Sequence, residues 1–191
     1  MPRPPAYDRD ALIDRARDLF WEKGWAGTSM KDLEAALDMR PGSFYAAFGS
    51  KDALFGLTLD RYAQDGAATL ARWARDGTPL DALKAHLLSF AQPGNRPSQA
   101  CMLVKGLLEI GTRNPALSDR IAAHLDGMEA RFAALFAAAQ AAGEVAGHHD
   151  PRRLARRYQA DLTGLRATAE RPGVDARALA DELVADLDRL A

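Results

Sequence analysis

Apolar side chains recur at intervals of three and four residues along most of this chain, and no stretch alternates in the manner of a strand. The segment from about Arg9 to Lys23 shows the pattern clearly, and Gly24 follows it as a helix stop. Its apolar face carries Leu12, Ile13, Ala16, Leu19 and Phe20. We therefore predict an all-α protein of about nine helices.

Later helix starts are marked by a capping side chain followed by proline, at Thr78-Pro79, Asn114-Pro115 and Asp150-Pro151. Clusters of proline and glycine at 93–97 and 171–175 interrupt the periodic pattern. The helices expected after Ser50 cover about 51–75, 79–92, 101–112, 115–143, 151–170 and 175–190.

The stretch from Thr28 to Lys51 predicts two short helices joined by a tight turn. The first helix has one apolar face, and the second carries two phenylalanines that can pack back on it. These residues are Met30, Leu33 and Leu37, then Phe44 and Phe48. The outer face left to the second helix consists of Gly42, Ser43, Tyr45 and Ala46. A short helix with such a face fits a major groove about 12 Å wide, so the stretch indicates a helix-turn-helix and a DNA-binding protein.

Two motifs in this region carry a family resemblance. They are Gly24-Trp25-x-x-Thr28-Ser29-x-x-x-Leu33 and Met39-x-x-Gly42-x-Phe44-Tyr45-x-x-Phe48-x-Ser50-Lys51-Asp52-x-Leu54. Together they resemble the DNA-binding signature of tetracycline-repressor-like (TetR/AcrR) regulators. The resemblance implies a transcriptional regulator, most often a repressor, with an N-terminal three-helix head over 1–53 (motif about 29–48). It also implies a C-terminal helical bundle for ligand binding and dimerisation over 54–191.

The chain departs from the family pattern at three positions. Asp38 stands in the turn where the family commonly has glycine, Arg40 stands where a serine or threonine often caps the second helix, and Ala47 replaces a common polar residue. A lost hydroxyl cap costs about 1 kcal/mol. Pro41 at the first helical position offsets part of that loss. These differences bear on the operator sequence rather than on the fold.

The residues of the motif divide into two predicted kinds of DNA contact. Those facing base edges are Arg40, Pro41, Gly42 and Ser43, those near phosphates are Tyr45 and Lys51, and Thr28 and Ser29 complete the predicted DNA-binding set. One short helix contacts few base pairs, so we expect two heads related by a two-fold axis on a palindromic operator in double-stranded DNA.

The charge of the chain is low for a DNA-binding protein. Its net charge is −1, and the first 55 residues hold eight basic and nine acidic side chains. DNA-binding domains usually carry a basic patch, so affinity is expected to depend on local placement of charges and on helix N-termini. Residues 1–7 are expected to form a mobile arm, with Arg3 either reaching a minor groove or belonging to an ordinary disordered terminus.

Composition bears on the compartment. The single cysteine, Cys101, excludes an internal disulfide and cysteine-based zinc fingers and fits a reducing environment. No run of 18 apolar residues is present, and the N-terminus lacks an apolar signal-peptide core. We therefore expect a cytoplasmic protein that does not span a membrane.

An enzyme has little support from the sequence, because neither a nucleophile–base motif nor a phosphate-binding glycine loop occurs. His148, His149 and Asp150 are possible metal ligands, but a solvated turn in which Asp150 caps a helix is the preferred interpretation. No cofactor and no metal site is predicted. The alternative function is an all-α interaction or enzyme domain that does not bind DNA.

The segment from Ala100 to Arg113 is similar to a Cys-Leu-Leu-Val-Asn-x-x-Leu-Glu segment in part of the same family, with Lys105 in place of the Asn. Cys101, Lys105 and Glu109 lie four residues apart on an otherwise apolar helix. Two interpretations remain open. Lys105 and Glu109 either pair with each other or anchor a polar small-molecule inducer, and Cys101 is either a core residue in the pocket wall or a redox sensor.

The last two helices carry apolar stripes, Leu154, Tyr158, Leu162 and Leu165 in one and Leu179, Leu183, Leu187 and Leu190 in the other. Each stripe faces either the core of its own domain or a second copy of the chain. The resemblance implies a homodimer formed through these helices, at about 151–170 and 175–190.

Overall fold

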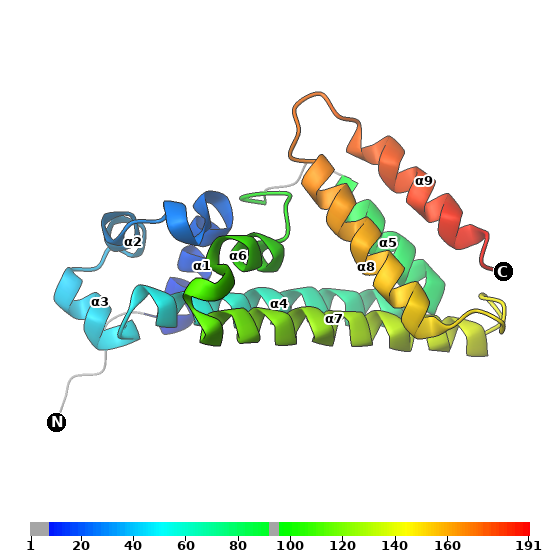
Figure 1. Cartoon of the computed structure of the whole chain (residues 1–191), viewed down its shortest axis with the longest axis horizontal. Helices are drawn as coiled ribbons and strands as arrows, with labels where there is room; N and C mark the ends of the chain where they lie inside the picture. Colours follow the sequence, from blue (N-terminus) through cyan, green and yellow to red (C-terminus); the bar gives the residue numbers. More distant parts are fainter. Residues whose placement is uncertain (1–7, 92–95) are drawn as a thin grey trace. The chain divides into compact units, whose positions relative to one another are not determined.

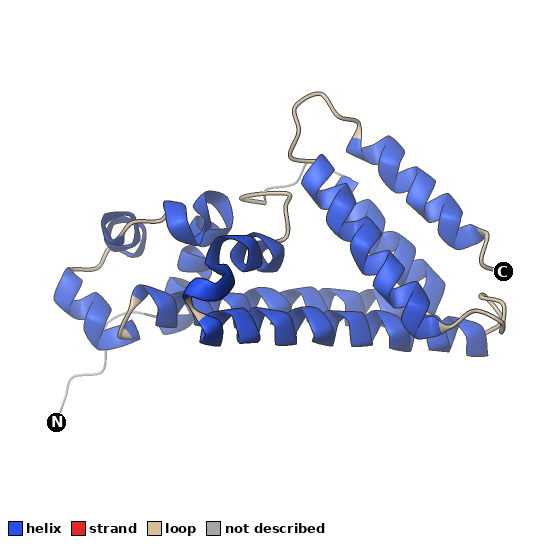
Figure 2. Ribbon diagram, viewed as in Figure 1, coloured by secondary structure: helices blue, strands red, loops and turns tan. Residues whose placement is uncertain are grey.

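The computed structural model describes residues 8–91 and 96–191. Within them the chain is helical and contains no strand, as predicted (Figures 1 and 2). The helices are α1 (Arg9–Gly27), α2 (Met30–Leu37), α3 (Pro41–Phe48), α4 (Lys51–Asp76), α5 (Pro79–Ala91), α6 (Met102–Ile110), α7 (Pro115–Ala141), α8 (Pro151–Thr168) and α9 (Ala176–Asp188). A short 3-10 helix, η1 (Gly111–Arg113), follows α6. The N-terminal arm with Arg3 lies outside the described residues.

The chain forms two compact units, each of which is discontinuous in sequence. Unit 1 comprises Met1–Gln64 and Met102–Ala122, and unit 2 comprises Asp65–Cys101 and Ala123–Ala191. The long helices α4 and α7 contribute residues to both units. The functional boundary between residues 53 and 54 stays a prediction.

Helix α1 is interrupted at Gly24, where the sequence predicted its end. Gly24 has φ +79° and ψ 168°, a conformation that side chains other than glycine rarely adopt. A Cβ atom at this position would lie 2.1 Å from Oε1 of Glu109. The Thr28 hydroxyl donates to the Gly24 carbonyl at 2.6 Å and closes the turn that leads to α2.

The core of unit 1 joins the helix-turn-helix to α4 and α6. Phe20 and Phe55 meet edge to face with ring centroids 4.9 Å apart. Phe44 and Leu33 are fully buried, so the inner face of the helix-turn-helix matches the predicted one. Gly106 on α6 has no side chain, and a Cβ there would lie 3.2 Å from the Phe55 ring, so glycine allows the two helices to approach closely.

The core of unit 2 surrounds a buried polar pair, His86 and Tyr158. The Tyr158 hydroxyl donates to the Leu83 carbonyl at 2.9 Å, and its oxygen lies 3.0 Å from Nδ1 of His86. Since the tyrosine proton is used on Leu83, Nδ1 of His86 carries a proton and donates to Tyr158. Burial, and then the charges of Arg166 and Arg96, lower the pKa of His86 to about 3, so the imidazole is neutral.

The apolar stripes of α8 and α9 face the core of unit 2. Tyr158, Leu162 and Leu165 are buried, as is Leu187, and Leu154, Leu179, Leu183 and Leu190 pack against the same cluster. Helix α9 lies mainly along α5 (Figure 1). Of the two orientations that the sequence left open, the leucines therefore adopt the one directed at their own domain.

Candidate nucleic-acid interface

The start of α2 is fixed by a reciprocal cap. The Ser29 hydroxyl accepts from the Asp32 N–H at 3.1 Å, and the Asp32 carboxylate accepts from the Ser29 N–H at 2.8 Å. Lys23 contacts the same carboxylate at 2.6 Å. Its hydrogen bond, followed by those of Ser29, holds the pKa of Asp32 well below its usual value. Ser29 is exposed, whereas Thr28 is 1 % exposed and serves the turn at Gly24.

The turn between α2 and α3 uses a left-handed residue. Asp38 has φ 53°, the conformation for which the family commonly uses glycine. Arg40 precedes α3 without a side-chain cap, and Pro41 occupies the first turn. The N–H groups of Gly42 and Ser43 therefore have no partner within the helix, and both residues are exposed. This leaves the positive end of α3 open to an anion.

Helix α3 has one buried and one exposed face. Phe44 and Phe48 are 0 % and 5 % exposed, and their rings lie 5.6 Å apart. The opposite face, which we call the α3 outer face, consists of Arg40, Pro41, Gly42, Ser43, Tyr45 and Ala46, all of them exposed. A Cβ at Gly42 would meet nothing within 4 Å, so this face is unobstructed. The structure thus brings together the five residues predicted to contact DNA from α3 and its N-cap.

Lys51 lies at the start of α4, directly after the Ser50 cap, and is held against an aromatic ring. Its Nζ is 4.5 Å from the centre of the Trp25 ring. The Trp25 indole donates to Asp52 at 2.9 Å, and Asp52 also accepts from Asn114 at 2.9 Å. The sequence does not predict this network. Trp25 and Asp52 occur in it as motif residues and Asn114 as a helix cap, but their spacing does not connect them.

Several acidic residues of the head are engaged in ion pairs away from α3, whereas Asp38 is exposed in the turn before it. Asp10 and Asp14 contact Arg61 at 2.8 Å and 3.5 Å, and Lys23 contacts Asp32. Helix α3 itself contains no acidic residue. The first turn of α3 can therefore still present the positive end of a helix dipole, with Arg40 as its basic residue and Asp38 as an acidic neighbour.

The predicted inducer residues of α6 contact α1. Lys105 Nζ donates to the carbonyls of Trp21 at 2.7 Å and Glu22 at 3.3 Å, which lie within one helical turn before the break at Gly24. The Glu109 carboxylate accepts from the Ala26 N–H at 2.8 Å, just after the break. Cys101 is 5 % exposed. We call Lys105 and Glu109 the α6 clamp.

The histidine pair lies on the loop before α8. The His148 and His149 rings are 4.0 Å apart, and the Asp150 carboxylate accepts from the Arg152 N–H at 2.9 Å, as predicted for a helix cap. Across residues 8–91 and 96–191, no group of three or more candidate ligands is placed to hold a metal ion. None of the helices in these ranges has the length and hydropathy needed to cross a membrane.

Comparison with known proteins agrees with this geometry. A family model described as "Bacterial regulatory proteins, tetR family" matches residues 12–57, and one described as "Tetracyclin repressor-like, C-terminal domain" matches residues 78–173. The E. coli K12 repressor ComR is 44 % identical over 66 residues, 35 % of this chain and 31 % of ComR. The E. coli K12 repressor BdcR is 33 % identical over 110 residues, 55 % of each chain. The matches thus span about a third to a half of these curated relatives.

Solved structures match nearly the whole chain. A cysteine mutant of the regulator CifR, complexed with 26-bp operator DNA, has a TM-score of 0.84 and 28 % identity over 98 % of both chains. Reduced E. coli NemR has a TM-score of 0.78 at 19 % identity over 95 % of both chains, which shows a shared fold. With two family models over most of its length and a helix-turn-helix at the expected place, the chain belongs to the tetR family of bacterial regulatory proteins.

Proposed function

We propose that this protein is a repressor that binds a palindromic operator as a homodimer and releases it when a small molecule binds. The strongest support is the α3 outer face, which is exposed on a helix whose opposite face is locked by two buried phenylalanines. ComR and BdcR are named transcriptional repressors, and the CifR mutant was solved with operator DNA. A regulator of this kind acts in the cytoplasm and is not an enzyme, with a head over 1–53 and an effector domain over 54–191.

We assign the DNA contacts from the exposure of each group. In this assignment Arg40 and the first turn of α3, which are exposed, contact base edges, while Tyr45 and Lys51 contact phosphates. Ser29, exposed at the start of α2, adds a further phosphate contact. Thr28 is buried, so its part is to fix the turn from which α2 begins.

The homodimer uses the faces of α8 and α9 that their leucines leave free. On α8 these include small exposed residues, Ala160, Gly164 and Ala167, which allow another helix to approach closely. Arg153 and Arg156 on α8 and Glu182 on α9 are also exposed. Opposite charges on the two helices favour pairing of α8 with α9 of a second copy.

The α6 clamp gives the proposed inducer a mechanism. A small molecule that contacts Lys105 or Glu109 has to compete with the α1 backbone for these charged side chains. Its binding then loosens the break at Gly24, from which α2 and α3 follow. The conformation favoured by the ligand binds the operator less tightly, and the coupling is reciprocal.

Selection of bound sequences from random duplex DNA tests the proposal. A palindrome with two half-sites about one helical turn apart is expected. Arg40→Ala has to relax the selected sequence, whereas Arg131→Ala, an exposed charge on α7, is the matched control and has to leave it unchanged. Absence of any enriched sequence would favour an all-α domain that does not bind DNA.

A further inference from the structure

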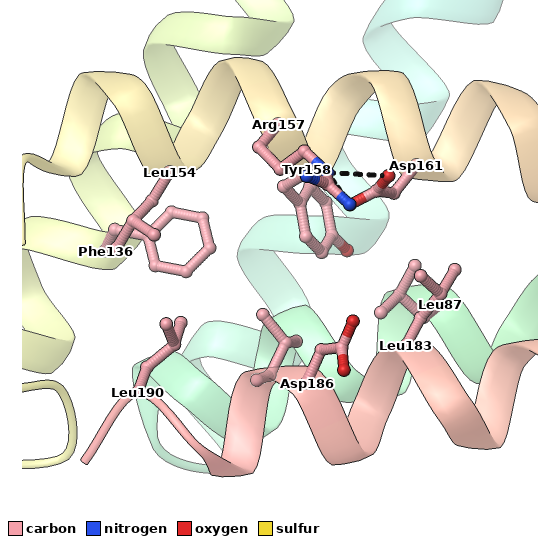
Figure 3. Close-up of a pocket in the computed structure, with 10 residues that line it drawn as sticks. Leu87, Phe136, Leu154, Arg157, Tyr158, Asp161, Leu183, Asp186 and Leu190 are labelled. Carbon is pink, nitrogen blue, oxygen red and sulfur yellow. Dashed lines mark hydrogen bonds and ion pairs between the residues drawn. The ribbon is translucent and has the colours of Figure 1, made fainter.

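A pocket of about 220 Å³ opens between α8 and α9 in unit 2 (Figure 3). Leu87 from α5 and Phe136 from α7 line it, and each is 1 % exposed. The pocket therefore reaches from the surface into the core of the unit. Its residues are separate from the α6 clamp, which belongs to unit 1.

The remaining walls are mostly aliphatic. Leu154 on α8, Leu183 on α9 and Leu190, just beyond the end of α9, point into the space between the helices (Figure 3), and all three are only partly buried. An apolar occupant would remove their remaining apolar surface from water, which is the main source of affinity in such a site.

The charged residues that line the pocket are already paired. Arg157 donates to both carboxylate oxygens of Asp161, at 3.0 Å and 2.8 Å, and Asp186 pairs with Arg189. An ion entering the pocket would lose hydration without gaining an unpaired partner of opposite charge. The lining thus favours a neutral ligand.

The size of the pocket restricts its occupant further. An α-helix with side chains is about 10 Å wide, so a helix of a second copy cannot enter a space of this volume. Apolar cavities of about 150 Å³ hold a benzene molecule. We propose that this pocket binds a neutral small molecule whose apolar body is about the size of one aromatic ring with a short substituent.

Helix α9 is held in place over the pocket at its C-terminal end. The Ala146 N–H donates to the Leu190 carbonyl at 2.7 Å, and Lys84 pairs with Asp188. The site is thus preformed, and occupancy bears on the spacing of α8 and α9. An effect of the ligand on operator binding rests on the proposed function, because these two helices are the proposed dimer surface. Binding of the ligand to the pocket does not depend on the proposed function.

Calorimetric titration of the full chain with toluene and n-propylbenzene tests the proposal, with benzoate and benzylamine as charged analogues of similar shape. We expect one neutral molecule per chain and binding of the charged analogues weaker by about tenfold or more. Leu183→Phe fills the pocket and is expected to reduce affinity for toluene by about tenfold. Leu108→Phe is the matched control, since Leu108 is 80 % exposed on α6, and has to leave affinity unchanged.

Leu154→Phe provides a second filling variant from α8, and circular dichroism checks that each variant is folded. Equal binding of benzoate and toluene to the unmodified chain would overturn the proposal, as would absence of toluene binding. Toluene binding that appears only when the protein is diluted to a monomer would also contradict the proposal. It would show that a side chain of a second copy occupies the pocket in the dimer. Operator affinity is measured separately, so toluene binding without operator release contradicts only the proposed regulation.

Discussion

Helices α3 and α6 both carry polar residues beside a buried apolar face, yet unit 1 uses them differently. On α3, the first turn is uncapped and the outer face is exposed. On α6, Lys105 and Glu109 contact the backbone of α1 on both sides of a break. Polar groups satisfied inside their own unit stabilise the fold, whereas those left exposed on a rigid helix are available to a partner. The difference separates structural residues from candidate contact residues.

The break in α1 explains why α6 needs charges of both signs. The segment before Gly24 ends in carbonyls without helical partners, which an ammonium group can satisfy. The segment after it begins with N–H groups, which a carboxylate can satisfy. Lys105 and Glu109, one helical turn apart, match these two ends. The clamp therefore positions the chain from which α2 begins.

The largest expected effect is the difference in the free energy of unfolding between alanine substitutions at two glycines of unit 1. Gly24→Ala places a Cβ at φ +79° and 2.1 Å from Glu109, so we expect a loss of about 3 kcal/mol in the free energy of unfolding. Gly42→Ala meets open space within a helix and should raise stability by up to about 1 kcal/mol. Urea denaturation measures both. A Gly24→Ala variant as stable as Gly42→Ala would show that α1 is not clamped.

The α3 outer face is tested by its effect on DNA. Arg40→Ala should weaken operator binding by about 1 to 3 kcal/mol while leaving binding to random DNA nearly unchanged. Lys51→Ala should weaken both and reduce the log–log salt slope by about one for each head. Fluorescence anisotropy over a salt series measures these changes. Equal weakening of specific and random DNA by Arg40→Ala would remove it from the base-contacting residues.

Substitutions in the α6 clamp should mainly affect stability. Lys105→Met and Glu109→Ala each remove a charged hydrogen-bond partner of α1, and each is expected to cost about 1 to 2 kcal/mol because the bonds are partly exposed. Lys31→Met, at an exposed position of α2, is the control and should be nearly neutral. If both clamp variants keep full stability yet lose the response to an inducer, the clamp residues are ligand anchors instead.

Local patterning was sufficient to predict most of the fold. The spacing of Phe44 and Phe48 determined which face of α3 is buried, and Asp150 and Asn114 marked helix starts that the structure confirms. Gly24 likewise marked a real break in α1. Each of these features depends on residues within one or two helical turns, where sequence and conformation are directly coupled.

The features that the sequence left open depend on distant contacts. Glu109 and its partner Ala26 are 83 positions apart, so no local pattern in the sequence indicated this contact. The four-residue spacing on α6 suggested a pair between Lys105 and Glu109 instead. In α9 the periodicity of Leu183 and Leu187 shows that one face is apolar, but a domain core and a dimer surface give the same pattern. Only the packing of α9 along α5 distinguishes them.

His86 and His148 also differ in that one is enclosed and the other is exposed. We expect this difference to have a smaller effect on the free energy of unfolding. The pKa of His86 is lowered to about 3 by burial among aromatic rings and by nearby arginines, whereas His148 is exposed. The unfolded chain has an ordinary histidine pKa of about 6.5, so below that pH it binds a proton that the folded state does not. Stability should therefore fall as pH decreases from about 6.5 toward 3.

Urea denaturation at pH 7 and pH 5.5 measures this term before most carboxylates titrate, and we expect a decrease of roughly 1 kcal/mol. His86→Phe keeps a ring among Phe90, Phe132 and Tyr158 but cannot titrate, so the decrease should shrink. His148→Gln should retain it. If His86→Phe kept the full decrease and His148→Gln abolished it, His86 would be solvated and protonated in the folded protein. The enclosed polar pair of unit 2 would then be open at neutral pH.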